Sequence, residues 1–118
     1  MVKILNIKKI LSKKGNIYKI ISSDKLYPIK EIYITTVKKN IPKSWRTHTN
    51  CDTILLCIKG KVEVEFNKKK KIIKDNLINF ILIKKNTKFR LLSKVKKSLV
   101  MSFLKIPHKK IKSIFYED

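Results

Sequence analysis

Residues 59–66 read Lys59-Gly60-Lys61-Val62-Glu63-Val64-Glu65-Phe66. After the glycine, Val62, Val64 and Phe66 alternate with charged side chains and therefore share one face of an extended chain. This period of two predicts a β-strand over residues 61–66 that buries one face. An apolar run at residues 53–58 precedes the turn at Lys59-Gly60, and this order predicts a β-hairpin with residues 53–58 as its first arm.

The same alternation recurs along most of the chain and predicts an all-β fold. Polar turns at residues 67–70, 75–76 and 84–87 separate short strands, and this spacing indicates a sandwich or a barrel. The lysine run at residues 68–71 is interpreted as a solvated hairpin tip. The pattern does not decide whether residues 1–14 and the tail after Pro107 form strands. The predicted strands cover residues 17–21, 31–37, 53–58, 61–66, 71–73, 80–83, 88–92 and 98–104.

The composition is that of one soluble domain. The chain has 118 residues, of which 43% are hydrophobic, and this is enough for a single domain over residues 1–118. No run approaches the roughly 20 apolar residues of a membrane span, and the N-terminus lacks a signal-peptide pattern. We therefore expect a cytoplasmic protein without a membrane partner. Cys51 and Cys57 follow no disulfide framework and are expected to be reduced thiols.

The net charge of +22 raises the question of nucleic-acid binding, because a basic surface attracts phosphate groups. Arg46 and Arg90 are the only arginines, however, whereas recognition of bases and bidentate binding of phosphate favour arginine. The lysines are also spread along the chain beside many Ile and Asn residues, a composition that AT-rich coding favours. The charge therefore argues for anionic small molecules, such as nucleoside diphosphates, rather than a nucleic acid.

The clearest candidate for a functional site lies just before the apolar run at residues 53–58. His48, one of two histidines, stands here close to a tryptophan and an arginine. Histidine can move a proton near neutral pH, and arginine can pair with phosphate oxygens. These residue types at the lip of a barrel predict a site that holds a polar ligand and transfers a proton. The segment reads Lys43-Ser44-Trp45-Arg46-Thr47-His48.

Four segments together resemble the small cupin proteins related to dTDP-4-dehydrorhamnose 3,5-epimerase, over roughly residues 15–118. The dTDP-sugar 3,4-ketoisomerases are a neighbouring cupin group of similar size. The resemblance implies a cupin-type double-stranded β-helix, or jelly-roll barrel, that acts on a nucleoside-diphosphate sugar in surface polysaccharide biosynthesis. It also implies a homodimer, since cupin sheets commonly pair across subunits. The segments are Glu31-Ile32-Tyr33-Ile34-Thr35-Thr36-Val37, Ile41-Pro42-Lys43-Ser44-Trp45-Arg46-Thr47-His48, Gly60-Lys61-Val62 and Ile106-Pro107-His108.

Many cupins bind a metal, so the ligand positions of the general cupin pattern can be compared directly with this chain. When Gly60 is aligned with the glycine of that pattern, His48 falls at its second histidine. Arg46 then stands at the first histidine of the pattern, and Thr53 stands at its glutamate. Phe89 stands at the last histidine. One ligand of four is left, whereas a stable site needs three or four. We expect no metal and no cofactor, as the resemblance to the epimerases also implies.

In the epimerases that this chain resembles, a histidine removes the proton beside a ketone, and a tyrosine on the opposite face of the sugar returns one. The resemblance implies that His48 is this base. Arg46 and Lys43 match basic groups that would face the diphosphate or stabilise the enolate. Trp45 matches a residue that would wall the pocket. These are the substrate-binding residues that the resemblance predicts.

The tyrosine is where the chain departs from the epimerases, because residues 99–104, the corresponding region, contain none. Tyr33, on the strand face shared with Thr35, is the best substitute, and Tyr18 and Tyr27 rank behind it. The missing tyrosine argues against full epimerisation and leaves open proton abstraction, ketoisomerisation, or binding of a sugar nucleotide without turnover. Nucleic-acid binding, which rests on the net charge alone, ranks behind these functions.

Structural interpretations compete with these roles. His108 follows Pro107, which fixes the local backbone, and its ring is expected to hydrogen-bond a carbonyl. A tryptophan near a barrel mouth, such as Trp45, also commonly closes a core, and Tyr33 is an ordinary strand residue. The functional assignment of these two residues therefore rests on the resemblance.

Overall fold

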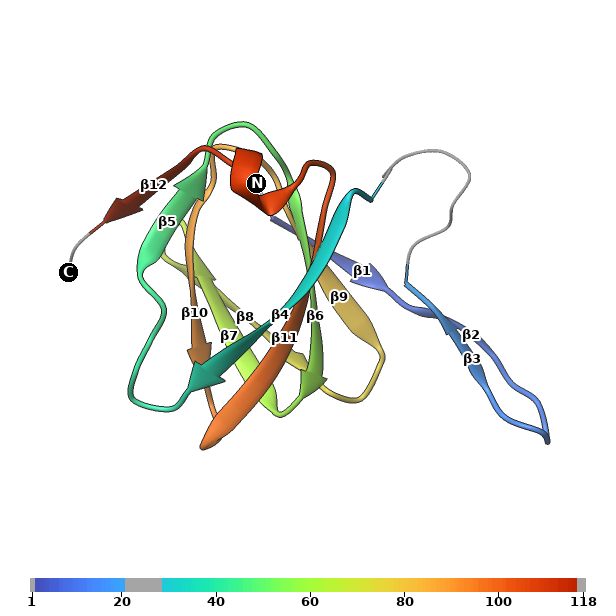
Figure 1. The fold of residues 1–118 in the computed structure, drawn as a ribbon. Coiled ribbons are helices and arrows are strands. Elements are labelled where there is room, and N and C mark those ends of the chain that lie inside the picture. Colours follow the sequence, from blue (N-terminus) through green and yellow to red (C-terminus); the bar gives the residue numbers. More distant parts are fainter. Residues whose placement is uncertain (1, 21–28, 117–118) are drawn as a thin grey trace.

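The computed structural model describes residues 2–20 and 29–116, and β-strands make up nearly all of the regular secondary structure of these residues (Figure 1). Two five-stranded antiparallel sheets face each other, and a two-stranded sheet projects from them. A short 3₁₀ helix, η1 (His108–Lys110), follows the last strand of the first sheet. The prediction of an all-β fold is confirmed.

Each sheet combines strands from distant parts of the chain. In spatial order, the first sheet contains β1 (Val2–Asn6), β9 (Asn79–Ile83), β6 (Thr53–Lys59), β11 (Lys97–Leu104) and β4 (Glu31–Lys38). The second sheet contains β12 (Ser113–Tyr116), β5 (Trp45–His48), β10 (Lys88–Ser93), β7 (Lys61–Phe66) and β8 (Lys69–Lys74). The projecting arm consists of β2 (Lys8–Ile10) and β3 (Ile17–Lys19) (Figure 1).

Apolar side chains fill the space between the two sheets. Val62, Val64 and Phe66 point into this core from β7, as their alternation predicts, and they meet Leu55 and Ile81 of the first sheet. Full burial of one such side chain stabilises the fold by roughly 1.5–3 kcal/mol. A second apolar cluster lies on the outer face of the first sheet, with residues of β6, β9 and β11.

The predicted strand positions agree closely with the structure, but the predicted hairpin is wrong. β7 covers residues 61–66 as predicted, and β6 ends one residue beyond position 58. β6 pairs with β9 and β11, whereas β7 pairs with β8 and β10. The chain instead crosses from one sheet to the other at Gly60. The reason is that residues 53–57 of β6 are all buried, so β6 needs a central position in a sheet that is covered on both faces.

The hairpin that the structure does form joins β7 to β8. Asn67 and Lys68 have φ values of 46° and 61°, and a type I′ turn requires such left-handed values at both central positions. All four lysines of residues 68–71 are exposed, so the run is solvated as predicted, but β8 begins at Lys69 and only Lys68 lies in the turn itself. A two-residue turn matches the twist of the strands, and this leaves the later lysines to extend the sheet.

Both regions that the pattern left open contain strands. Residues 1–14 include β1 and β2, and the tail after Pro107 includes β12. The strand predicted at residues 17–21 corresponds to β3, which ends at Lys19. Residue 21 lies outside the described residues.

Gly60 is a position where we expect no side chain to be tolerated. Its φ is +94°, and a Cβ built there would overlap Ser98 Oγ and lie 3.0 Å from Val95 Cγ2. We expect Gly60→Ala to lower the free energy of unfolding by on the order of 3 kcal/mol, measured by urea denaturation. Gly15→Ala is the matched control, because Gly15 has φ +132° but a Cβ there would meet no atom of the described residues within 4 Å. Equal losses in the two variants would show that the overlap with Ser98 contributes nothing.

Candidate active site

The inner face of β5 carries two of the predicted site residues, Arg46 and His48. Arg46 lies directly opposite Phe89 of β10, and Phe89 belongs to the core between the sheets. Residues opposite each other in an antiparallel pair point to the same face. Arg46 and, two residues later, His48 therefore point inward, whereas Trp45 and Thr47 point outward.

The facing wall comes from β4. Val37 is fully buried in the core, and Tyr33 and Thr35 share its face because successive residues of a strand alternate. Tyr33 lies opposite Ser102 of β11, and Ser102, like Val37, is buried. Tyr33 is near enough to Arg46 to affect the pKa of its guanidinium group. The inner face at this end of the barrel is therefore polar.

The chain after β11 returns past this polar wall. The backbone N–H of His108 donates a hydrogen bond of 2.8 Å to Oε1 of Glu31, which ties η1 to the start of β4. The His108 ring lies edge-on to the Tyr33 ring, with the two centroids 4.9 Å apart. A second imidazole therefore stands beside the tyrosine that the sequence put forward.

β12 adds two further residues to the group. It pairs antiparallel with β5, so that Ser113 lies opposite His48 and Phe115 lies opposite Arg46. His48 Nδ1 and Ser113 Oγ are 2.6 Å apart, in a hydrogen bond whose donor depends on the tautomer of the ring. The guanidinium carbon of Arg46 lies 5.3 Å from the Phe115 ring centroid, a cation–π distance. Both inner-face residues of β5 thus contact β12.

His48 is the most deeply buried member of the group, with 8% of its surface exposed. Burial is the largest cause that lowers its pKa from 6.5 to about 4, and the charges of Arg46 and His108 lower it further. The ring is therefore neutral at pH 7 and keeps one nitrogen lone pair free to accept a proton. Phe89 packs against the ring at a centroid distance of 5.6 Å and an angle of 66°.

Arg46 supplies the positive charge of the group. Burial lowers the pKa of its guanidinium group and Tyr33 counteracts this, but a guanidinium stays protonated at physiological pH in either case. Its Nε donates a hydrogen bond of 3.2 Å to the carbonyl oxygen of Ser44. A neutral base beside a fixed cation suits the removal of a proton next to a ketone, because the cation stabilises the enolate oxygen as its charge develops.

The structure does not group Trp45 and Lys43 with these residues. Trp45 lies on the outer face of the second sheet, where Lys88 Nζ and the guanidinium carbon of Arg90 are 5.4 and 4.9 Å from its ring centroid. Lys43 lines a surface cavity of about 260 Å³ at the end of β4. Of the five residues predicted for the site, the three on the inner face are thus brought together.

Sequence reasoning also missed members of the group. Ser113 and Phe115 lie in the tail whose structure the pattern did not decide, and His108 was assigned a structural role. The apolar residues at positions 114–116, in an otherwise lysine-rich tail, were the available signal for a strand. Of the alternative tyrosines, Tyr18 lies in the projecting arm, and Tyr27 lies outside the described residues.

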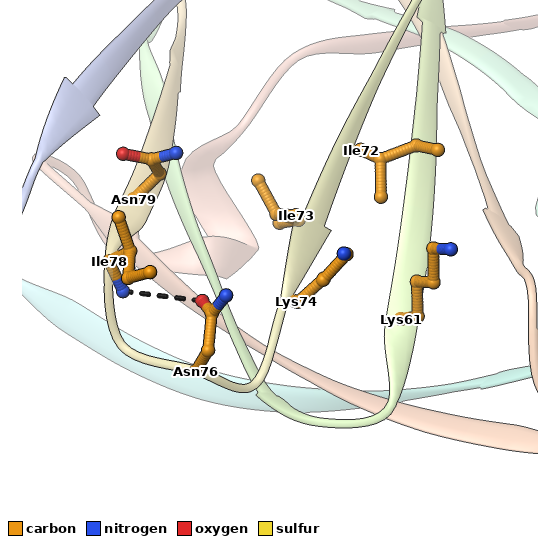
Figure 2. Close-up of a pocket in the computed structure, with 7 residues that line it drawn as sticks. All are labelled: Lys61, Ile72, Ile73, Lys74, Asn76, Ile78 and Asn79. Carbon is orange, nitrogen blue, oxygen red and sulfur yellow. Dashed lines mark hydrogen bonds between the residues drawn. The ribbon is translucent and has the colours of Figure 1, made fainter.

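A surface cavity of about 360 Å³ lies between β8 and the start of β9 (Figure 2). Ile72, Ile73 and Ile78 form its apolar part, and the backbone N–H of Ile78 donates a hydrogen bond of 3.4 Å to Oδ1 of Asn76. None of its lining residues is a histidine or belongs to the inner-face group. It therefore provides no base of the kind that His48 offers.

The surroundings of His48 do not fit a divalent metal. The hydroxyl of Ser113 and the phenyl ring of Phe89 contact His48, and the positive charge of Arg46, which acts on the same ring, repels a cation. Across residues 2–20 and 29–116, no three His, Cys, Asp or Glu side chains gather as metal ligands would. The same residues contain no helix long and apolar enough to span a membrane.

The sequence matches the model of a known protein family, which is described as FdtA: WxcM-like, C-terminal. The match covers residues 1–112, nearly the whole chain. The chain belongs to this family. No curated protein matches it.

Solved structures of low sequence identity share the fold. A dTDP sugar isomerase from Desulfovibrio desulfuricans has a TM-score of 0.80 at 15% identity, over 98% of this chain and 83% of that chain. A variant of the 3,4-ketoisomerase QdtA from Thermoanaerobacterium thermosaccharolyticum, in complex with TDP-4-keto-6-deoxyglucose, has a TM-score of 0.75 at 19% identity, over 96% and 86% of the two chains. NovW, a 4-keto-6-deoxy sugar epimerase from Streptomyces spheroides, has a TM-score of 0.77 at 5% identity, over 91% and 64%. The fold of this family member is the cupin-type jelly roll that the resemblance implied.

Proposed function

We propose that this protein is a metal-independent isomerase that moves a proton in a nucleoside-diphosphate 4-keto sugar. The observation that carries the proposal is a neutral, buried His48 beside the charged Arg46 on a polar inner face. Proteins of the same fold act on dTDP-linked sugars, and we take a dTDP-linked sugar as the substrate. The product would serve surface polysaccharide assembly, and the reaction would take place in the cytoplasm, where nucleotide sugars are made.

His48 acts as the base in the first step. Its unprotonated ring nitrogen accepts the proton from the carbon next to the ketone. The electron pair of that C–H bond forms the C=C bond of the enolate, and the second pair of the C=O bond moves onto the ketone oxygen. Arg46 stabilises the negative charge that develops on this oxygen. In an alternative position of the substrate, Arg46 instead binds the diphosphate. Removal of one C–H proton thus needs only the two inner-face residues of β5.

The second step decides which isomer forms. When His48 returns its proton to the former ketone carbon on the same face, and a hydroxyl proton passes to the former ketone oxygen, the carbonyl moves and a ketoisomer results. Inversion at one carbon instead requires an acid on the opposite face of the sugar. We assign to Tyr33 of the facing wall the proton transfer that His48 does not perform. In ketoisomerisation this is the transfer between the two oxygens, and in epimerisation it is the protonation of the inverted carbon.

An anionic substrate would also tune the base. A pKa of about 4 makes His48 a weak proton acceptor in the free protein, since a general base works best with a pKa near the operating pH. A diphosphate or enolate close to Arg46 offsets the positive charge that lowers this pKa. We therefore expect substrate binding to raise the pKa of His48 towards neutrality.

Proton NMR of dTDP-4-keto-6-deoxyglucose in heavy water tests the proposal. We expect the purified protein to deplete the signals of the ring protons that flank the ketone, because each abstracted proton exchanges with deuterium. The positions that exchange separate ketoisomerisation from epimerisation. Broadened nucleotide signals without exchange would contradict the catalytic proposal and favour a cupin that only binds the sugar nucleotide. Unchanged signals would contradict both.

We further propose that the protein is a homodimer. Ile32 and Ile34 lie on the outer face of the edge strand β4 and are 52% and 54% exposed, beside the apolar cluster on the first sheet. Pairing of this face with a second copy would remove the exposed apolar surface from water. We expect sedimentation at micromolar concentration to give twice the mass of the chain, and Ile34→Glu to shift it towards the monomer. A monomeric wild-type protein would contradict the proposal.

A further inference from the structure

Tyr33, Arg46 and His48 each contact one residue of the chain after β11. Of these three contacts, the one between His48 and Ser113 is a hydrogen bond, with 2.6 Å between Nδ1 and Oγ, and the other two are ring contacts. A hydrogen bond has a direction and distinguishes the two ring nitrogens of a histidine, whereas a ring contact does not. Ser113 is therefore the residue of this segment that can set the chemistry of His48.

The sheet register explains why Ser113 meets Nδ1. Ser113 and His48 are opposite each other across β12 and β5, so their Cβ atoms start from neighbouring points on the same inner face. Nδ1 is the ring nitrogen closer to the backbone, so it faces the short serine side chain, and Nε2 reaches further from the sheet. The edge contact with Phe89 restrains the ring plane. A half-turn of the ring would replace Nδ1 by a carbon and break the bond to Ser113.

We propose that Ser113 is a positioning residue whose hydroxyl oxygen accepts a hydrogen bond from Nδ1–H of His48, so that Nε2 keeps its lone pair for the substrate. The proposal rests on the proposed function insofar as it names the nitrogen that takes the substrate proton. The proposal also requires the Nδ1–H tautomer of His48 in the free protein, and this requirement does not depend on any substrate.

The tautomer decides whether His48 can work as a base. A neutral imidazole carries one proton, and the nitrogen without it is the acceptor. If Nε2 carried that proton, the remaining lone pair would point at Ser113 and none would be left for the sugar. Free neutral imidazole side chains favour the Nε2–H form, so the protein must supply a partner that reverses this preference.

The tautomer can be measured directly by nitrogen NMR of this 118-residue chain with ¹⁵N-labelled histidine, without substrate, at pH 7. The chain has only two histidines, so His48 and His108 give two ring systems to assign. An unprotonated ring nitrogen resonates well downfield of a protonated one. We expect Nδ1 of His48 at the protonated position and Nε2 at the unprotonated position. The reverse pattern in the wild-type protein would overturn the proposal.

Three variants separate positioning from a merely structural role. In Ser113→Ala we expect the His48 signals to move towards the Nε2–H form, and in Ser113→Thr, which keeps the hydroxyl, we expect the wild-type pattern. Thr49→Val is the matched control, because the Thr49 hydroxyl donates to the Lys112 carbonyl oxygen at 3.1 Å and joins the same two segments without contacting His48. An unchanged His48 tautomer in Ser113→Ala would overturn the proposal. If Ser113→Ala does not fold, a wild-type Nε2–H pattern still overturns it.

Kinetics then test the consequence for turnover. We expect Ser113→Ala to lower kcat by about 10- to 100-fold with KM little changed, since the base is present but mostly in the wrong tautomer. A normal kcat in a protein with the altered tautomer would overturn the role of Nε2. The two proposals fail separately: a wild-type protein without proton exchange contradicts the isomerase function, whereas exchange with an Nε2–H His48 contradicts only the role of Ser113.

Discussion

Replacement of His48 by glutamine is expected to lower the rate of proton exchange in the sugar by roughly 100- to 10,000-fold, the contribution that a positioned general base typically makes. Glutamine keeps polar atoms in place of the ring but accepts no proton at neutral pH. His48 contacts Ser113 and Phe89 in the folded chain, so a loss of structure must be excluded by circular dichroism. The exchange rate is measured by NMR in heavy water under saturating substrate.

Two controls make this result specific. Affinity for dTDP, measured by titration calorimetry, is expected to change little in His48→Gln, because Arg46 supplies the charge that attracts the diphosphate. Thr49→Val, on the same segment but without contact to the ring, is expected to retain the wild-type exchange rate. Exchange at the wild-type rate in a folded His48→Gln protein would remove His48 from the mechanism.

Acidification from pH 7 to pH 4 is expected to cost the wild-type protein roughly 3 kcal/mol of stability through His48 alone. Above about pH 6.5 the ring is neutral in both the folded and the unfolded chain. Below that value the unfolded ring takes up a proton, but the folded ring, whose pKa is about 4, does not. The unfolded state therefore binds more protons between these two values, and stability falls as the pH falls through this range.

Urea denaturation of wild-type protein and His48→Gln at pH 7, 6, 5 and 4 measures the contribution of His48 to the pH dependence of stability. The two proteins share every other ionisable group, so the difference between their stabilities isolates the contribution of His48. We expect the wild-type protein to lose more stability than the variant, with most of the difference between pH 6.5 and pH 4. Arg46 and His108 are the charged groups that contribute to the shift besides burial. Parallel pH profiles would show that the folded ring titrates normally.

The alternation of apolar and charged residues was sufficient to predict most of the strands, because burial of one face per strand is a local property of the sequence. β7, with Val62, Val64 and Phe66 in the core, is the clearest case. The same local pattern could not predict pairing. β6 and β7 are adjacent in sequence and look like a hairpin, but the buried faces of β6 place it in the other sheet.

The candidate site was predictable in part for the same reason. Arg46 and His48 lie two residues apart in one segment, so a single strand delivers both to one face. Tyr33 could be proposed from its strand face and from the resemblance. Ser113 and His108 come from the tail, about 60 residues after His48 in the sequence, and only the register of β12 on β5 and the bond of His108 to Glu31 bring them to the group.

Trp45 is placed differently from Arg46, although the two are adjacent in sequence. The resemblance implied that Trp45 walls the pocket. Neighbouring residues of a strand point to opposite faces, however, and Trp45 lies on the outer face with Lys88 and Arg90 against its ring. Once β5 is recognised as a strand, the same rule that places Arg46 inside places Trp45 outside.

The most direct test is a crystal structure of His48→Gln with dTDP-4-keto-6-deoxyglucose bound, since this variant should hold the substrate without converting it. We expect the sugar on the polar inner face between β4 and β5, with a carbon next to the ketone in contact with residue 48 and an anionic or ketone oxygen in hydrogen-bond reach of Arg46. A nucleotide sugar bound instead on the outer face beside Trp45, or in the cavity between β8 and β9, would contradict the assignment of the active site.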